Sequence, residues 1–280
     1  MNAGPEELKA RVLELVEHQD EKPVSQKVKL LNETLMPLFQ ALAEQNPTPD
    51  LAQQVPLVQG LWHCTWSTIP FQDILPGRVH QQSYQIFADN GLYANMARYR
   101  PGHNQPLLNW ASRWLLSYDL MILQTYEIEL GAAEIGGSSR VKSGRTEADH
   151  PAQRWAIENV GIKQRLRFGP TPLDTGSAIA WFQQAVRQHQ QSSEKSFGQS
   201  FGQSSGRSSK PQAIAMPTKG IDRKTQKRYE QVYKARPQLE HLYIDHNFRL
   251  VKSVREQNQR PSYTIGTKLG YGSDSCKIRP

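Results

Sequence analysis

The stretch Gly60-Leu61-Trp62-His63-Cys64-Thr65-Trp66-Ser67-Thr68-Ile69 marks the point where the hydrophobic pattern of the chain changes from helical to strand-like. Aromatic and β-branched residues dominate this segment, and both kinds of residue favour extended backbone. Gly60, at the start of this segment, interrupts the preceding helical pattern. We therefore predict that a β-sheet begins with a strand over residues 61–69.

Short runs of the same character follow, with turn signals between them. The Asn90-Gly91 pair lies between two such runs and favours the positive φ angles of a tight hairpin. The predicted strands cover residues 82–87, 92–99, 114–130 with a break near Tyr118-Asp119, 139–147, 154–160, 162–168, 239–244, 248–254 and 262–268. Many short strands of this kind are typical of a meander that closes into a barrel or sandwich. Closure would place residues 61–69 and 239–268 in one sheet.

Apolar residues recur at helical spacing before the first strand. One stripe ends at Asp20-Glu21-Lys22-Pro23, and a second contains Pro37, where we expect a kink because proline removes a backbone donor. Asn46-Pro47-Thr48-Pro49 ends the second stripe. The stripes are formed by Leu8, Val12, Leu15 and Val16, and by Val28, Leu31, Leu35, Leu38 and Leu42. Residues 1–50 are therefore predicted to form helices that pack on the barrel.

The pattern changes again between residues 171 and 236, which we predict to be a helical insertion before the closing strands. Asp174 or Thr175 is placed to cap a helix that continues through Val186. Residues 192–210 contain a Ser-Phe-Gly-Gln repeat and have the composition of a flexible linker. The predicted class is thus mainly β with helical additions (α+β): a barrel formed by residues 57–170 and 237–269, with a tail at 270–280.

Composition and charge exclude collagen-like, fully disordered and multi-span membrane proteins. The chain has 280 residues, 37% of them hydrophobic, and a mean hydropathy of -0.66, which suits a folded water-soluble protein. No apolar run approaches the roughly 18 residues that span a bilayer, and the first residues are not basic and then apolar, so we expect neither a membrane anchor nor a signal peptide. The two cysteines, Cys64 and Cys276, lie far apart and are expected to be free thiols in a reducing compartment.

No motif in the sequence indicates a reactive centre. Two Gly-x-Ser-x-Gly strings lie inside the 192–210 repeat, without the preceding strand that a nucleophile elbow requires. The eight histidines include no His-Glu-x-x-His pattern, and no phosphate-binding glycine loop follows a predicted strand. We expect a protein without enzyme activity, without a metal site and without a required cofactor.

Two stretches resemble the plastid lipid-associated protein (PAP)/fibrillin family. The first runs from Leu42-Ala43-Glu44-Gln45-Asn46-Pro47-Thr48-Pro49 to Leu57-Val58-Gln59-Gly60-Leu61-Trp62, and is similar to that family's helix, breaker and Gly-x-Trp strand. The second, Leu242-Tyr243-Ile244-Asp245-His246-Asn247-Phe248-Arg249-Leu250, is similar to a late strand and turn of the family. The matching motif positions are Gly60, Trp62, Tyr243, Asp245 and Arg249.

The resemblance implies a lipocalin-like antiparallel barrel that binds or shields a lipophilic molecule, such as a lipid, carotenoid, quinone or other isoprenoid. It also implies a location peripheral to the thylakoid membrane, on its cytoplasmic or stromal side, or at plastoglobules. The aromatic residues of the predicted barrel are the candidate ligand contacts, although aromatic residues also fill ordinary cores. These candidates are Trp62, Trp66, Tyr84, Phe87, Tyr93, Tyr99, Trp110 and Trp114.

The excess positive charge of the chain lies in its last third. Residues 192–280 carry 17 Lys and Arg against 7 Asp and Glu, whereas the whole chain has a net charge of +8. A basic segment predicts contact with an anionic membrane surface or an acidic membrane-bound protein, and nucleic acid is the less favoured partner. The residues assigned to this contact are Arg223, Lys224, Lys227 and Arg228.

Two other functions remain open at this point. The chain would act as a scaffold or assembly factor if the barrel is filled by its own side chains and the basic insertion docks an acidic protein or nucleic acid. A chaperone that hands a pigment to another protein would instead bind its ligand transiently.

Overall fold

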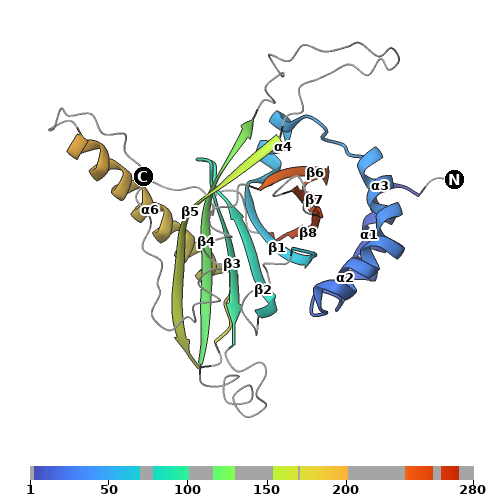
Figure 1. The fold of residues 1–280 in the computed structure, drawn as a ribbon, viewed down its shortest axis with the longest axis horizontal. Coiled ribbons are helices and arrows are strands. Elements are labelled where there is room, and N and C mark those ends of the chain that lie inside the picture. The colour runs from blue at the N-terminus through green and yellow to red at the C-terminus, as the bar shows by residue number, and fades with distance from the viewer. Residues whose placement is uncertain are drawn as a thin grey trace.

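The computed structural model describes residues 3–69, 78–100, 116–129, 154–169, 171–200, 237–254 and 260–270. Its centre is an antiparallel sheet of eight strands that pair in chain order and close into a ring (Figure 1). The strands are β1 (Gly60–Ser67), β2 (Arg78–Phe87), β3 (Leu92–Tyr99), β4 (Leu116–Glu129), β5 (Arg154–Phe168), β6 (Gln238–Ile244), β7 (Phe248–Val254) and β8 (Ser262–Lys268). The predicted class, mainly β with helical additions, is confirmed.

Strand β1 joins the two ends of the sheet. It pairs with β2 on one side, where Gly60 faces Phe87, and with β8 on the other, where Cys64 faces Gly266. The prediction that residues 61–69 and 239–268 share one sheet is therefore confirmed. Gly60 has a φ of 113°, and a Cβ atom there would lie 3.2 Å from Lys268 Cε, so this entry into β1 requires glycine.

Two predicted strand breaks are wrong. Strand β4 continues through Tyr118-Asp119, because the buried Asp119 carboxylate accepts hydrogen bonds from Arg98 Nε at 2.7 Å and Arg167 Nε at 3.1 Å. An acidic residue whose local sequence favours a turn is thus satisfied by hydrogen bonds across the sheet. Strand β5 is also continuous, and a shift in its pairing with β4 replaces the expected break near residue 161. The strand predicted at 139–147 lies outside the described residues.

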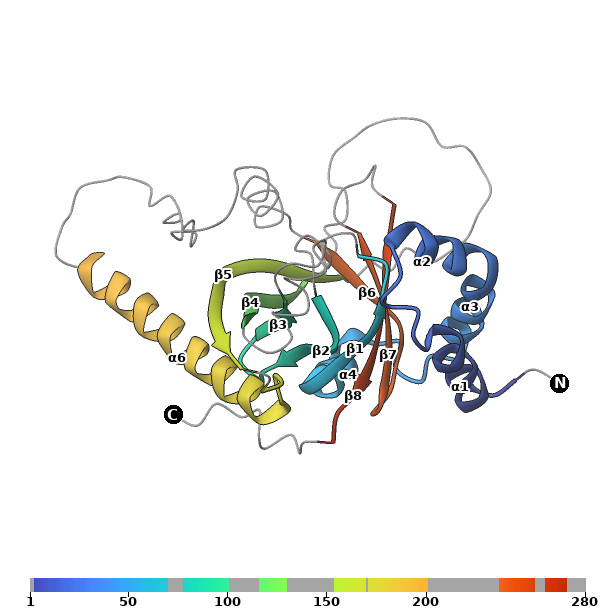
Figure 2. The ribbon, with the colours of Figure 1, turned by 90° about the horizontal axis from the view of Figure 1, so that it is seen from below.

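The N-terminal helices are confirmed and cover one outer face of the ring. They are α1 (Pro5–Val16), α2 (Val24–Leu30), the π-helical turn η1 (Leu31–Leu35) and α3 (Met36–Glu44). Figure 2 shows them stacked against β6, β7 and β8. The irregularity expected at Pro37 takes the form of the π-helical turn just before it. The helices bury Val12, Leu35, Phe39 and Leu42 against Trp66, Phe248, Leu250 and Ile265.

A further short helix, α4 (Leu51–Val58), closes one end of the ring. Asp50 caps it by accepting a hydrogen bond from the Ala52 backbone N–H at 3.0 Å. Two indole N–H groups of the ring donate to it: Trp62 Nε1 to the Val58 carbonyl at 2.7 Å, and Trp155 Nε1 to Gln54 Oε1 at 3.1 Å. This helix is missing from the sequence-based prediction, because eight residues that include a proline give no clear helical period.

Helix α6 (Thr175–Ser200) covers a second outer face, formed by β1 to β4. Its predicted cap is confirmed, since Asp174 Oδ1 accepts from the Ser177 backbone N–H at 2.7 Å. The helix extends to Ser200, so residues 192–200 of the predicted flexible linker are helical instead. Once the first turns are anchored, each added residue gains one hydrogen bond at little cost. Residues 201–210 and the basic segment lie outside the described residues. No described helix is long and apolar enough to cross a membrane.

Candidate ligand-binding cavity

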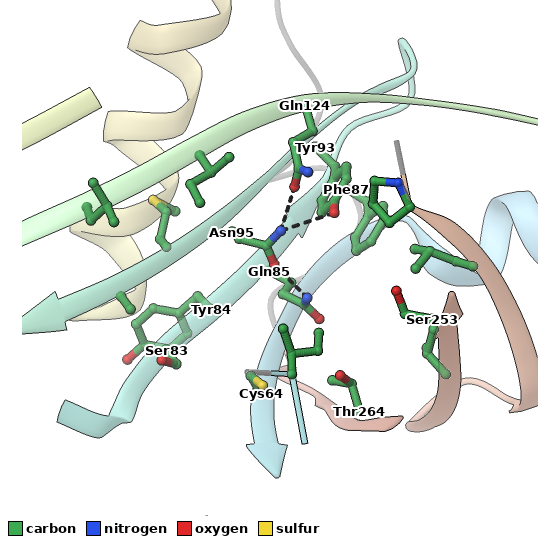
Figure 3. Close-up of a pocket in the computed structure, with 18 of the residues that line it drawn as sticks. Cys64, Ser83, Tyr84, Gln85, Phe87, Tyr93, Asn95, Gln124, Ser253 and Thr264 are labelled. Atoms are coloured by element: carbon green, nitrogen blue, oxygen red, sulfur yellow. Dashed lines mark hydrogen bonds between the residues drawn. The ribbon is translucent and has the colours of Figure 1, made fainter. Parts of the chain in front are cut away.

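The ring encloses a cavity of about 150 Å³. Side chains alternate between the two faces of a strand, so every second residue of each strand points inward. Most of the wall is aromatic or aliphatic, with a smaller number of amide and hydroxyl groups between (Figure 3). The lining includes Cys64, Gln85, Phe87, Tyr93, Asn95, Ala97, Tyr99, Leu120, Ile122, Gln124, Asn159, Leu239, Arg249, Val251, Ser253 and Thr264.

The floor of the cavity is aromatic. The rings of Phe87 and Tyr93 stack with their centroids 4.6 Å apart, and the Tyr126 ring meets the edge of both. Burial raises the pKa of Tyr126 to about 12, and its hydroxyl donates to the Ala88 carbonyl at 2.5 Å. Trp62 lies beneath, in the cluster that contacts α4. The floor is thus formed by packed aromatic rings.

A chain of amide side chains crosses the inner wall from β2 to β5. Gln85 Nε2 donates to Asn95 Oδ1 at 2.6 Å, and Asn95 Nδ2 donates to Gln124 Oε1 at 2.6 Å, as Figure 3 shows. Gln124 Nε2 then donates to Asn159 Oδ1 at 2.7 Å. The amides satisfy one another and leave the wall polar along one band. Sequence reasoning missed them, because only the strand pairing brings four scattered amides together.

Arg249 lies at one end of this amide chain. Its guanidinium Nη2 donates to Gln85 Oε1, and its Cζ lies 4.9 Å from the centre of the Trp62 ring and 4.6 Å from that of Phe87. Room for the side chain comes from Gly266 on β8, where a Cβ atom would lie 2.9 Å from Arg249 Nε. Burial lowers the pKa of Arg249 to about 10, which still leaves it charged at neutral pH.

The opposite end of the cavity is not purely apolar, because Arg78 lines the cavity and faces Tyr99 in the pairing of β2 with β3. Tyr99 and Leu120 line this end, and Tyr99 stacks on Tyr118 at 5.2 Å between ring centroids. Farther along β5, Leu166 and Phe168 are 59% and 76% exposed. Within the described part of the chain, these are the large apolar side chains left open to water.

Beside the cavity, Asp20 is buried among cations. It accepts hydrogen bonds from Lys27 Nζ at 3.2 Å and Arg78 Nη2 at 2.8 Å, and contacts His80 Nδ1 at 2.7 Å. It also accepts from the Ser67 backbone N–H at 3.0 Å, which ties the loop after α1 to strand β1. Burial alone raises the pKa of the Asp20 carboxyl, but His80, Arg78 and Lys27 together hold that pKa well below its usual range.

The structure separates the predicted ligand contacts into groups. Phe87, Tyr93 and Tyr99 line the cavity, and Tyr84 lies at its edge while its hydroxyl donates to the Leu173 carbonyl at 3.0 Å. Trp62 belongs to the floor. The position of Trp66 is corrected: it lies on the outer face, packed on Phe39. Trp110 and Trp114 lie outside the described residues.

The five family-motif positions lie in two different parts of the structure. Gly60, Trp62 and Arg249 meet at the floor of the ring, whereas Tyr243 and Asp245 lie at the β6–β7 turn. There Asp245 accepts from the Phe248 backbone N–H at 2.7 Å and from Lys9 Nζ at 2.5 Å. These contacts give Asp245 a structural part in joining the turn to α1.

Within the described ranges, no group of three or more His, Cys, Asp or Glu side chains is arranged to hold a metal ion. The buried Cys64, which is not in a disulfide, lines the cavity. Comparison of the chain with protein-family models, with curated proteins and with solved structures finds no match.

Proposed function

We propose that this protein binds a lipophilic small molecule inside the ring and does not transform it. The observation that carries the proposal is the cavity within the ring, whose wall is mostly apolar and whose floor is aromatic. Concave apolar sites with a few placed polar groups are the usual form of small-molecule sites. The resemblance to PAP/fibrillin proteins and their lipocalin-like barrels supports the same reading.

The volume of the cavity limits how large a part of a ligand can lie inside the ring. A dry cavity of about 150 Å³ holds a molecule the size of benzene. A whole carotenoid is far larger, so the enclosed part would be a ring headgroup, as in a quinone, or a short length of chain. The exposed apolar side chains of Leu166 and Phe168 extend the apolar surface on β5 for the remainder of such a ligand.

The proposed setting is the surface of a photosynthetic membrane. The basic residues Arg223, Lys224, Lys227 and Arg228 would hold the protein there by attraction to anionic lipid or to an acidic membrane-bound protein. Each cation near an anionic bilayer contributes about 1 kcal/mol, so four of them suffice for peripheral attachment.

Filling the cavity tests the binding site. Ala97 lines the cavity and Ala10 lies on the exposed side of α1, so Ala97→Phe and Ala10→Phe add the same ring inside and outside. We expect the Ala97→Phe protein to lose at least 90% of any isoprenoid or lipid extracted with organic solvent. The Ala10→Phe protein should keep the wild-type content, measured by mass spectrometry and absorbance.

The result that would contradict the proposal is a wild-type extract without stoichiometric lipid, together with no uptake of added quinone or carotenoid. That result would favour the scaffold function, in which the basic insertion docks an acidic protein or nucleic acid.

A further inference from the structure

Arg249 is a cation enclosed by the ring, and none of the described carboxylates is paired with it. Its side chain is 2% exposed, and its Nε atom has no hydrogen-bond partner among the residues that the structure describes. Burying an uncompensated charge is costly, so an arginine in this state indicates that something else completes its environment.

The carboxylates nearest to the core are already engaged elsewhere. Asp20 binds Lys27 and Arg78, Asp119 binds Arg98, and Asp245 binds Lys9. The contacts of Arg249 include the Gln85 amide and the rings of Trp62 and Phe87, and the Tyr93 hydroxyl and Cys64 thiol lie near enough to raise its pKa. Aromatic faces and an amide oxygen lower the cost of burying the guanidinium but do not neutralise it.

The ionisable groups near Arg249 form no ion pair with it among the described residues. Tyr93 and Cys64 lie close enough to raise the pKa of Arg249, against the larger effect of burial. Lys268 Nζ donates to the Leu57 carbonyl at 3.0 Å and is itself a cation. His241 on β6 is buried, and burial together with repulsion by Arg249 lowers its pKa to about 3, so it is neutral. Within the ranges that the structure describes, the Arg249 guanidinium is therefore bordered by aromatic rings and an amide and by no carboxylate.

We propose that the ligand of this cavity is an apolar carboxylate, with its carboxylate group held by Arg249 and its hydrocarbon part directed along the cavity toward Tyr99 and Leu120. This inference rests on the proposed function and narrows it from neutral lipophiles to acidic ones. A guanidinium matches a carboxylate in shape and charge, and a single negative charge balances a single arginine. The amide chain that begins at Gln85 orients the Arg249 guanidinium, which would bind the carboxylate of the ligand.

Octanoate and 1-octanol test this assignment, because they share a chain and differ in the charge of the headgroup. Binding is measured on the full-length, lipid-extracted protein by titration calorimetry and by quenching of tryptophan fluorescence at constant pH and salt. We expect the wild type to bind octanoate roughly tenfold to a hundredfold more tightly than 1-octanol, the range for a hydrogen bond to a charged group. The Arg249→Met protein should lose this preference and still bind 1-octanol.

Lys252→Met is the matched control, since Lys252 lies on the same strand and its side chain pairs with Glu240 on the outside. It should leave the preference for octanoate unchanged. Equal binding of octanoate and 1-octanol by the wild type would overturn the carboxylate assignment while the proposed function stands. Failure of both compounds to bind would overturn the carboxylate assignment, and failure of quinone and carotenoid uptake as well would overturn the proposed function. The wild-type comparison alone decides between these results if the Arg249→Met protein does not fold.

Discussion

Replacing Asp20 by alanine is expected to destabilise the protein by about 3–5 kcal/mol, the range for breaking a buried ion pair by removing one partner. Asp20 is 5% exposed and Lys27 is 1% exposed, so water cannot easily replace the lost carboxylate. The substitution would leave the buried charges of Lys27 and Arg78 without that anion and would release the Ser67 backbone N–H. Urea denaturation followed by circular dichroism measures the change in unfolding free energy.

The control is Glu14→Ala, which removes the partner of Arg11 in an exposed ion pair on α1. Exposed pairs of this kind contribute at most about 1 kcal/mol, so we expect a loss below that value. The prediction is contradicted if Asp20→Ala lowers the unfolding free energy no more than Glu14→Ala does. In that case the buried cluster would not stabilise the packing of α1 and α2 on the ring.

Mild acid is expected to destabilise the folded protein through His241. The pKa of this buried imidazole is lowered to about 3, against about 6.5 in the unfolded chain, because burial and Arg249 disfavour its protonated form. Its contribution to stability is therefore complete above pH 6.5 and decreases as the pH falls toward 3. The slope for one proton approaches about 1.4 kcal/mol per pH unit below pH 6, and the loss between pH 6.5 and 5 amounts to roughly 1.6 kcal/mol.

The measurement compares urea unfolding of the wild type and of His241→Leu at several pH values between 7 and 5. The variant should lose this part of the pH dependence, while carboxylates common to both proteins contribute equally and cancel. His246→Leu, at the exposed β6–β7 turn, is the matched control for the change from histidine to leucine itself. Parallel stability curves for the wild type and His241→Leu would contradict the assignment.

The order of strands and the helical additions follow from patterns that act locally. Three signals act on neighbouring residues alone. They are the alternating aromatic and β-branched residues of the strands, the Asn90-Gly91 turn and the Asp174 helix cap. These features therefore predict the elements at their observed places. The breaks expected in β4 and β5 are wrong because Asp119 is satisfied by arginines that are distant in sequence, which no local pattern reveals.

The site was less predictable than the fold, since small irregularities decide which side chains face inward. Pairing between β1 and β8 shifts between Cys64 and Trp66, so the simple alternation that begins at Trp62 does not extend to Trp66. Trp66 consequently faces the helices. The aromatic wall at Phe87, Tyr93 and Tyr99 was predictable from strand alternation, whereas the unpaired state of Arg249 depends on groups from four strands.

Closure of the ring between β1 and β8 also determines when the protein can fold. Cys64 and Gly266 are direct partners although some two hundred residues separate them, so their pairing costs considerable chain entropy and slows folding. During synthesis, β1 leaves the ribosome long before β8 and has no partner on that side until residue 268 has emerged. An unpaired edge of this length invites association with other chains. Early packing of α1 to α3 on Trp66 would shield this side of the nascent chain.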